Sequence, residues 1–153
     1  MFKWLRKLFN KQNQLVIKVK RVNSKAKLPT RAYSFDAGWD LYAIEDVRLA
    51  PGEQRDVKVG LAFEVPEGWH MQIHTRSSYG KKMLRCHLGI IDCGYRAELS
   101  IWIANYGTNY QQIKAGDKVC QVLFLPVPEV KLVEVDSLNP SQRGEKGHGS
   151  SGQ

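Results

Sequence analysis

Short stretches in which apolar and polar residues alternate run along most of this chain, and they restrict the fold more than any other feature. Successive side chains of a β-strand point to opposite faces, so a two-residue period indicates strands with one buried face. Turn signals such as Pro51-Gly52 and Pro66-Glu67-Gly68 separate the stretches. The pattern predicts an all-β sandwich or barrel. The expected strands are QLVIKVKRV (14–22), DVKVGLAFEV (56–65), HMQIHT (70–75), AELSIWIANY (97–106), KVCQVLFLPV (118–127) and VKLVEV (130–135).

The length and the charge of the chain narrow the class of protein further. Its 153 residues suffice for one domain with a hydrophobic core. Of the 23 Lys and Arg residues, ten lie in residues 1–31, which contain no acid, so residues 32–153 carry 13 basic and 15 acidic groups. The body of the protein is therefore close to neutral. A uniformly basic surface is not indicated, and we predict no sequence-specific binding of nucleic acid.

The two ends of the chain differ in composition from its centre, which predicts three regions. In residues 1–14, apolar Phe2, Leu5, Leu8 and Phe9 stand at helical spacing among basic residues. They predict a short amphipathic extension, which is either solvated or docks on an acidic membrane surface or a protein partner. Residues 15–138 form the expected β domain. Residues 139–153 are expected to be a flexible arm, because this end is rich in glycine and poor in aliphatic residues.

The cysteine content and the absence of long apolar runs bear on the compartment. No stretch approaches the length of a membrane span, and no signal peptide is evident. Three cysteines are too few, and odd in number, for a disulfide framework, so we expect a reducing, cytoplasmic compartment (the host cytoplasm for a viral protein). Cys86, His87 and Cys93 lie close together in sequence but lack the paired spacing of a zinc site.

Two stretches carry polar groups of the kind that catalysis on phosphates requires. In GIIDCGYR (89–96), Asp92 closes an apolar run and is either a turn residue or a base held in a partly dry place. TRSSYG (75–80) offers Arg76, Ser77 and Ser78 in one turn. These side chains are suited to holding phosphate oxygens, although an ordinary polar turn has the same composition.

Three further places show polar residues with a choice of roles. Asp40 and Gln121 each stand within an apolar strand, where they need a partner: a cation or hydrated metal for the carboxylate, and hydrogen bonds for the amide. Most such inserts are structural. In the arm, Arg143 and the serines at 150 and 151 have the chemistry of a phosphate clamp, and His148 could lie over a planar ligand. A plain Gly/Ser tail is the alternative.

Together these stretches resemble the trimeric dUTPase family. AGWDLYA (37–43), TRSSYG (75–80), GIIDCGYRAEL (89–99), GDKVCQVLF (116–124) and RGEKGHGSSG (143–152) are similar to its five motifs, in the same order and at similar spacing. The resemblance covers Leu15 to Gly152. It implies a β jelly roll that forms homotrimers, with active sites built from motifs of more than one subunit and closed by the arm. It also implies hydrolysis of dUTP to dUMP and pyrophosphate with Mg²⁺, which keeps uracil out of DNA and supplies dUMP for dTMP synthesis.

The resemblance also assigns roles to residues. Asp92 would be the general base for the water that attacks the α-phosphate, and Tyr95 would stack under the deoxyribose. Asp40 would meet Mg²⁺ through its hydration shell, and Gln121 would bond phosphate or the catalytic water. A β-hairpin around residues 84–92 would read uracil. The remaining substrate contacts implied are Arg76, Ser77, Ser78 and Gly80 with the phosphates, His87, Gly89 and Ile91 in the hairpin, and Arg143, His148, Gly149, Ser150 and Ser151 in the arm.

Two positions depart from the family pattern. His148 stands where most members have phenylalanine, which implies weaker stacking on uracil, and Ala97 stands where glycine is usual. Two alternative functions follow from the sequence. The related dCTP deaminases use a glutamate where this chain has Arg96, which cannot act as a base. A binding or regulatory module that recruits a partner through residues 1–14 is the alternative outside enzymology.

Overall fold

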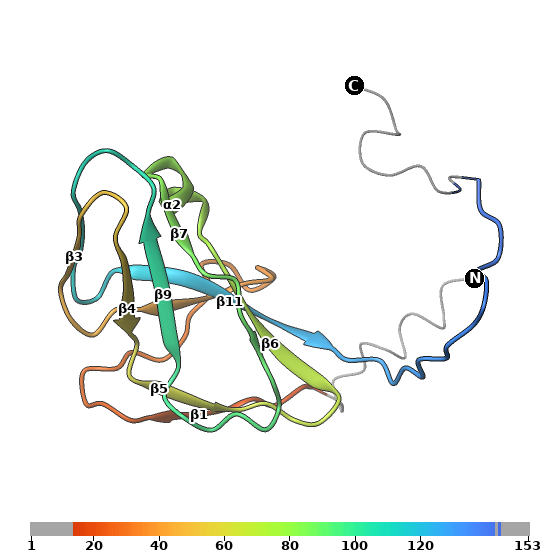
Figure 1. The fold of residues 1–153 in the computed structure, drawn as a ribbon. Helices are drawn as coiled ribbons and strands as arrows, with labels where there is room; N and C mark the ends of the chain where they lie inside the picture. Colours follow the sequence, from red (N-terminus) through yellow and green to blue (C-terminus); the bar gives the residue numbers. More distant parts are fainter. Residues whose placement is uncertain (1–13, 143, 145–153) are drawn as a thin grey trace.

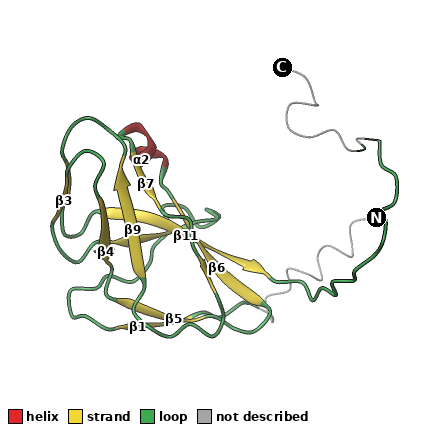
Figure 2. Cartoon of the chain, viewed as in Figure 1, coloured by secondary structure: helices red, strands yellow, loops and turns green. Residues whose placement is uncertain are grey.

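The computed structural model describes residues 14–142 and residue 144 as a β protein with one short helix. Figure 2 shows that strands and the loops between them make up nearly all of this part of the chain. The elements are β1 (Lys18–Arg21), β2 (Trp39–Tyr42), β3 (Val47–Leu49), β4 (Gln54–Lys58), β5 (Leu61–Glu64), β6 (Trp69–His74), α2 (Ser77–Lys81), β7 (Leu84–Cys86), β8 (Ile90–Ile91), β9 (Ser100–Asn105), β10 (Gln111–Ile113) and β11 (Lys118–Pro126).

The strands pair antiparallel in four small sheets. The largest has the order β2-β11-β6-β8, and a second has the order β4-β9-β7. The pairs β1-β5 and β10-β3 complete the set. Figure 1 shows β4, β9 and β7 side by side, with β11 crossing them at a steep angle. Strands distant in sequence therefore pair throughout, and the all-β jelly-roll fold predicted from the sequence is confirmed.

The hydrophobic core lies between the two larger sheets, and it follows from the alternation in the sequence. In β9 the residues Ile101 and Ile103 are buried, whereas Trp102 between them is exposed. In β6 the residues Met71 and Ile73 are buried in the same way. These two strands thus contribute every second side chain to the core, as a two-residue period requires, whereas β2 and β5 each bury three residues in succession.

Two strand predictions need correction. The stretch 56–65 is divided at Gly60, whose φ of +66° favours glycine and turns the chain from β4 into β5. A Cβ at Gly60 would also lie 2.9 Å from the Cβ atoms of Asn23 and Ala26. The stretch VKLVEV (130–135) forms no strand at all and is exposed, because no described strand lies beside it. The apolar and polar residues of this stretch do alternate, but a strand also needs a pairing partner, and none of the described residues provides one.

The predicted hairpin around residues 84–92 is also wrong in its pairing. β7 pairs with β9, whereas β8 pairs with β6, so the two strands belong to different sheets. Residues 87–89 therefore form a crossover loop between the sheets.

Predictions for the two ends of the chain fall mostly outside the described residues. The amphipathic helix predicted for residues 2–9 lies outside the described residues, as do most residues of the arm. None of the helices in the described part has the length and apolar character that crossing a membrane requires.

Candidate active site

Four polar side chains meet on one face of the large sheet, and we call them the Asp40 cluster: Asp40, Arg76, Lys118 and Gln121. Asp40 is only 3% exposed. Its Oδ1 lies 3.3 Å from Arg76 Nε, and its Oδ2 lies 2.7 Å from Lys118 Nζ. Gln121 Nε2 donates to the same carboxylate over 3.3 Å. Two cations against one carboxylate leave a net positive charge, which suits an incoming anion.

Strand pairing brings Asp40 and Gln121 together, and a bulge adds Lys118. Asp40 in β2 lies directly opposite Gln121 in β11, so both side chains occupy the same face. Lys118 precedes Gln121 by three residues, and strict alternation would place it on the other face. The β2–β11 register shifts between Lys118 and Cys120, however, and the extra residue returns Lys118 to the face of Asp40. Lys118 could not be predicted as a member of the cluster, because nothing in GDKVCQVLF indicates this bulge.

Gly38 leaves the space that Gln121 fills. A Cβ at Gly38 would lie 3.1 Å from both Cβ and Cδ of Gln121 and 3.2 Å from its Oε1. These distances are shorter than ordinary van der Waals contact. The glycine of AGWDLYA thus allows the Gln121 amide to lie flat against the backbone of the neighbouring segment.

Arg76 lies between the end of β6 and the start of α2. Its extended backbone precedes the helix, and its carbonyl accepts the amide protons of Tyr79 and Gly80 at 3.0 and 3.2 Å. The side chain reaches back to Asp40, and Nη1 donates to the Lys118 carbonyl at 3.4 Å. Ser77 and Ser78 lie in the first turn of α2 and are exposed beside Arg76. The TRSSYG segment is therefore a short helix, with its serines available to solvent or ligand.

Residues 92–95, the Asp92 turn, form the second candidate region. The turn closes with a bond from Tyr95 N to Asp92 O at 3.0 Å. Asp92 is exposed, and among the described residues no side chain bonds to its carboxylate. Tyr95 is 39% exposed, and its hydroxyl donates to the Glu98 carbonyl at 2.9 Å. Of the two readings of Asp92, the structure supports a turn residue with a free carboxylate, rather than one in a dry pocket of its own chain.

The Asp92 turn lies far from the Asp40 cluster within one chain. Ile91 pairs with Met71, so Asp92 lies one step further, near His70 at the start of β6. Arg76 follows His70 by six residues, along a strand and its extended continuation. At about 3.3 Å per residue, the separation is about 20 Å. Asp92 and Arg76 of the same chain therefore lie near opposite ends of β6.

The crossover loop, residues 87–89, is fixed at both ends by backbone bonds. His87 N donates to Trp102 O at 2.7 Å, and Gly89 O accepts from Ile73 N at 3.0 Å. Next to it, Cys86 N donates to Thr75 Oγ1 at 2.9 Å. Burial raises the pKa of the Cys86 thiol to about 11, so this thiol stays neutral near pH 7. His87 is exposed and Ile91 is half-buried. The loop is thus a rigid backbone edge open to a ligand.

The arm residues proposed to bind substrate lie outside the described part of the chain: Arg143, His148, Gly149, Ser150 and Ser151.

The side chains allow one kind of metal binding and not another. In the described part of the chain, no three His, Cys, Asp or Glu side chains gather around one point. Both oxygens of Asp40 already face cations. Oδ1 faces two donors, Arg76 Nε and Gln121 Nε2, whereas Oδ2 faces Lys118 Nζ and keeps a second lone pair, which can accept a metal-bound water. The residues therefore fit Mg²⁺ that arrives with a triphosphate and contacts Asp40 through water, and not a cage made by the protein alone.

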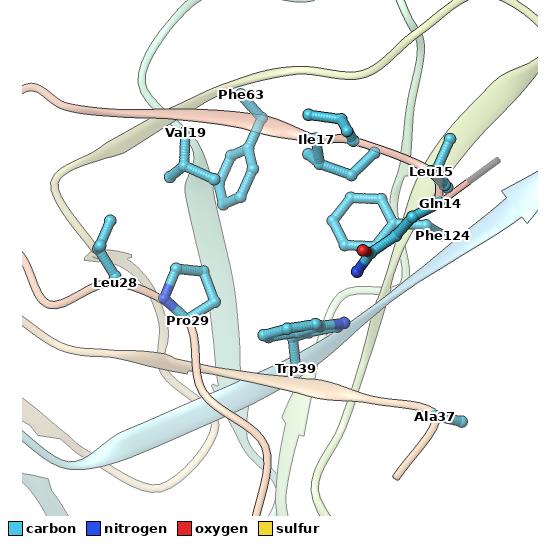
Figure 3. A pocket seen from close by; sticks show the side chains of 11 residues that line it. Gln14, Leu15, Ile17, Val19, Leu28, Pro29, Ala37, Trp39, Phe63 and Phe124 are labelled. Atoms are coloured by element: carbon cyan, nitrogen blue, oxygen red, sulfur yellow. The ribbon is translucent and has the colours of Figure 1, made fainter. Parts of the chain in front are cut away.

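A hollow of about 690 Å³ lies away from the Asp40 cluster. Figure 3 shows the rings of Trp39, Phe63 and Phe124 around it, beside Val19 of β1 and Ile17, which precedes this strand. Trp39 precedes Asp40 in β2, so its side chain points to the opposite face of the sheet. None of the described residues that line it has an ionisable side chain, so this hollow extends the core outward and is unsuited to a triphosphate.

A family model and the sequences of individual relatives both place this chain among the dUTPases. A family model described as dUTPase matches residues 24–152. The deoxyuridine 5'-triphosphate nucleotidohydrolase of Alkaliphilus metalliredigens (strain QYMF) is 40% identical over 139 residues, covering 89% of this chain and 96% of the relative. The enzyme of the same name from Anaplasma marginale (strain St. Maries) is 39% identical over 145 residues, covering 90% and 99%.

Solved structures agree. A variant dUTPase of Staphylococcus bacteriophage 80alpha with dUpNHpp has a TM-score of 0.84 at 29% identity, covering 90% of this chain and 99% of that one. A variant dUTPase of phage phi11 of S. aureus, described with a structural Mg(II) ion, has a TM-score of 0.76 at 26% identity, covering 82% and 99%.

The fold and these matches define a nucleotide-hydrolysing enzyme on a jelly-roll scaffold. More closely, the chain belongs to the dUTPase family, the dUTP diphosphatases. The resemblance noted in its five motifs and the enzyme class expected from it are both confirmed.

Proposed function

We propose that this chain hydrolyses dUTP to dUMP and pyrophosphate, with water attacking the α-phosphate. The observation that carries the proposal is the Asp40 cluster, in which residues of three family motifs meet with a net positive charge. Such a reaction keeps uracil out of DNA and supplies dUMP for dTMP synthesis.

The proposed chemistry assigns the proton to Asp92. Its exposed carboxylate accepts a proton from the attacking water while the water oxygen bonds to the α-phosphorus. The bond from this phosphorus to the α,β-bridging oxygen breaks, and pyrophosphate leaves. Arg76, Lys118 and the amide of Gln121 face the phosphate oxygens and stabilise their growing charge. Mg²⁺, when bound to the triphosphate near Asp40, supplies further charge neutralisation.

Selectivity for the nucleoside falls to the crossover loop and the Asp92 turn. The fixed backbone from His87 to Ile91 presents peptide groups to uracil, and the ring of Tyr95 lies against the deoxyribose. The hydroxyls of Ser77 and Ser78, with the backbone of Gly80, add contacts to the phosphates. In the arm, Arg143 and the serines at 150 and 151 grip the γ-phosphate, and His148 with Gly149 covers the base.

The working assembly is proposed to be a homotrimer whose sites are shared between copies. A separation of about 20 Å along β6 prevents one chain from applying its own Asp92 to a phosphate held at its own Arg76. In addition, residues 127–138 expose a row of aliphatic side chains, with Leu132 at 93% and Leu138 at 87%. Exposed apolar stretches of this kind favour association.

Residues 1–14 are proposed as an appendage that docks on an acidic membrane surface or a protein partner, and the cytoplasm as the compartment. The three cysteines, all described, are free thiols, in keeping with a reducing environment. A chain lacking residues 1–14 should hydrolyse dUTP at the parent rate. Loss of hydrolysis on this deletion would contradict the appendage role.

The direct test is an assay of the purified chain with Mg²⁺ against dUTP, dTTP, dCTP and UTP, resolving the nucleotide products and pyrophosphate. Conversion of dUTP alone, to dUMP and pyrophosphate, supports the proposal. Release of ammonia from dCTP would favour a deaminase. Tight binding of dUTP without turnover would favour a regulatory module.

A further inference from the structure

His74 lies beside the Asp40 cluster, although no motif drew attention to it. In the β11–β6 register, His74 is directly opposite Gln121, and in the β11–β2 register, Gln121 is directly opposite Asp40. Side chains directly opposite each other on antiparallel strands share a face, with Cβ atoms about 5 Å apart. Asp40, Gln121 and His74 therefore form a row across three strands, with Gln121 in the middle.

The imidazole of His74 carries a buried nitrogen that lacks a partner. Its Nε2 is excluded from solvent and makes no hydrogen bond to any described residue. A buried polar atom left without a hydrogen bond destabilises the folded chain. Such an atom beside a proposed site calls for a partner in another state of that site.

Gln121 is the group that can provide the partner. Asp40 only accepts hydrogen bonds, so the Gln121 amide presents its NH₂ to Asp40 and directs its carbonyl oxygen elsewhere. The 3.3 Å contact to Asp40 is long, so the Gln121 NH₂ can exchange it for a bond to a phosphate or a water. Because Gly38 has no side chain, it leaves room beside Cβ, Cδ and Oε1 of Gln121, in which the amide group can turn.

We propose that His74 is a positioning residue for Gln121 in the reaction. In the tautomer protonated at Nε2, its N–H donates to Gln121 Oε1 when the Gln121 NH₂ leaves Asp40 for the substrate. This bond satisfies the buried nitrogen and fixes the direction of the amide. The proposal rests on the proposed function, because it assigns His74 a part in the hydrolysis of dUTP.

The test uses two substitutions that keep different ring nitrogens. The amide nitrogen of glutamine can occupy the place of Nε2, whereas that of the shorter asparagine reaches only the place of Nδ1. His74→Gln and His74→Asn are each made alone and together with Gln121→Ala, and thermal unfolding checks that every chain is folded. For loss of one hydrogen bond, we expect His74→Asn to lower kcat about tenfold, with His74→Gln staying within about threefold of the parent. KM should change little in either.

The double variants separate positioning from support of the fold. Once Gln121 is alanine, His74→Asn should lower kcat no further, because the residue through which it acts is gone. An equal loss in both backgrounds, or equal damage by glutamine and asparagine, would overturn the proposal. Turnover of dUTP by the unsubstituted chain tests the proposed function separately. If the unsubstituted chain turns over dUTP but His74→Asn keeps the parent kcat, only the role of His74 is overturned and the proposed function stands.

Discussion

The Asp40 cluster is buried on paired strands, whereas the Asp92 turn is exposed in a loop. In the cluster, each oxygen of Asp40 has a cation within 3.3 Å, and strand register fixes the neighbours. In the turn, one backbone bond, the Tyr95 hydroxyl and the Arg96 guanidinium, which donates to the Cys93 and Tyr95 carbonyls, hold the chain, and the Asp92 carboxylate meets no described side chain. Under the proposed function, one chain forms the phosphate-binding half of a site by itself, and its proposed general base, Asp92, is exposed to another molecule.

The strongest test of this contrast removes the base without altering the cluster. Asp92→Asn should lower kcat about 10²–10⁴-fold, because a positioned general base contributes that much. The dissociation constant for dUpNHpp should change by less than about threefold, since the phosphate contacts remain. Glu45→Gln, which removes an exposed carboxylate between β2 and β3, near the opposite end of β11, serves as control. Parent-like turnover by Asp92→Asn would exclude Asp92 as the base.

Mixing variants tests whether the two halves come from different copies. Asp92→Asn and Arg76→Ala chains are each expected to be nearly inactive. Co-expressed and purified as mixed assemblies, they should regain about a quarter of the parent activity, the share of interfaces that combine both intact groups in random mixing. Mixtures as inactive as the separate variants would indicate that each chain uses its own Asp92 and Arg76.

Loss of the buried Asp40 carboxylate should destabilise the fold more than loss of the exposed Asp92 carboxylate. Asp40→Ala leaves Arg76 and Lys118 facing each other without a counter-charge, and we expect a loss of about 2 kcal/mol, less than for fully buried cations because both are partly exposed. Asp92→Ala should change stability by less than about 0.5 kcal/mol. Urea unfolding at one fixed protein concentration measures both, and a larger loss for Asp92→Ala would reverse the contrast.

The contact between Gly38 and Gln121 predicts a smaller effect. Gly38→Ala adds a methyl group 3.1 Å from Gln121 Cδ, so the amide must shift by a few tenths of an ångström. Displacing a side chain from its preferred rotamer costs about 1 kcal/mol, and kcat/KM should fall about fivefold. The free energy of unfolding, measured on the same chains, separates this effect from general destabilisation. Unchanged kcat/KM would mean that Gln121 tolerates the shift.

Thiol labelling compares the exposure of the two regions without any substitution, and its expected effect is the smallest. At pH 8 a thiol with its pKa raised by burial is almost entirely protonated, so Cys86 and the buried Cys120 should react with iodoacetamide only after unfolding. Cys93, half-buried in the Asp92 turn, should react first. Bound dUpNHpp should slow its labelling, which mass spectrometry of the digested protein would detect. Equal labelling of all three would contradict the burial described.

The sequence was sufficient for the long strands and insufficient for the short ones. β6, β9 and β11 have enough residues for alternation to emerge, whereas β3 and β10 have three residues each and leave no readable pattern. VKLVEV shows the converse, since its alternation predicted a strand that has no partner in the described chain.

Three residues of the Asp40 cluster could be selected from the sequence, but the geometry of the cluster could not. Motif resemblance selected Asp40, Arg76 and Gln121; strand register brings Asp40 and Gln121 together, and the Arg76 side chain reaches Asp40 from the start of α2. Lys118 escaped because a bulge alters its face, and His74 escaped because it reads as one more outward residue of a strand. Both depend on pairing between distant strands, which a local pattern cannot report.

The six-residue offset between Asp92 and Arg76 also has a consequence for newly made protein. If complete sites arise only between copies, a single chain leaving the ribosome is silent, and activity begins only when chains meet. Activity per chain would then fall on dilution, and a lag that shortens with rising concentration would precede steady turnover. Expression level would therefore control the enzyme twice, through the number of chains and through the fraction that has assembled.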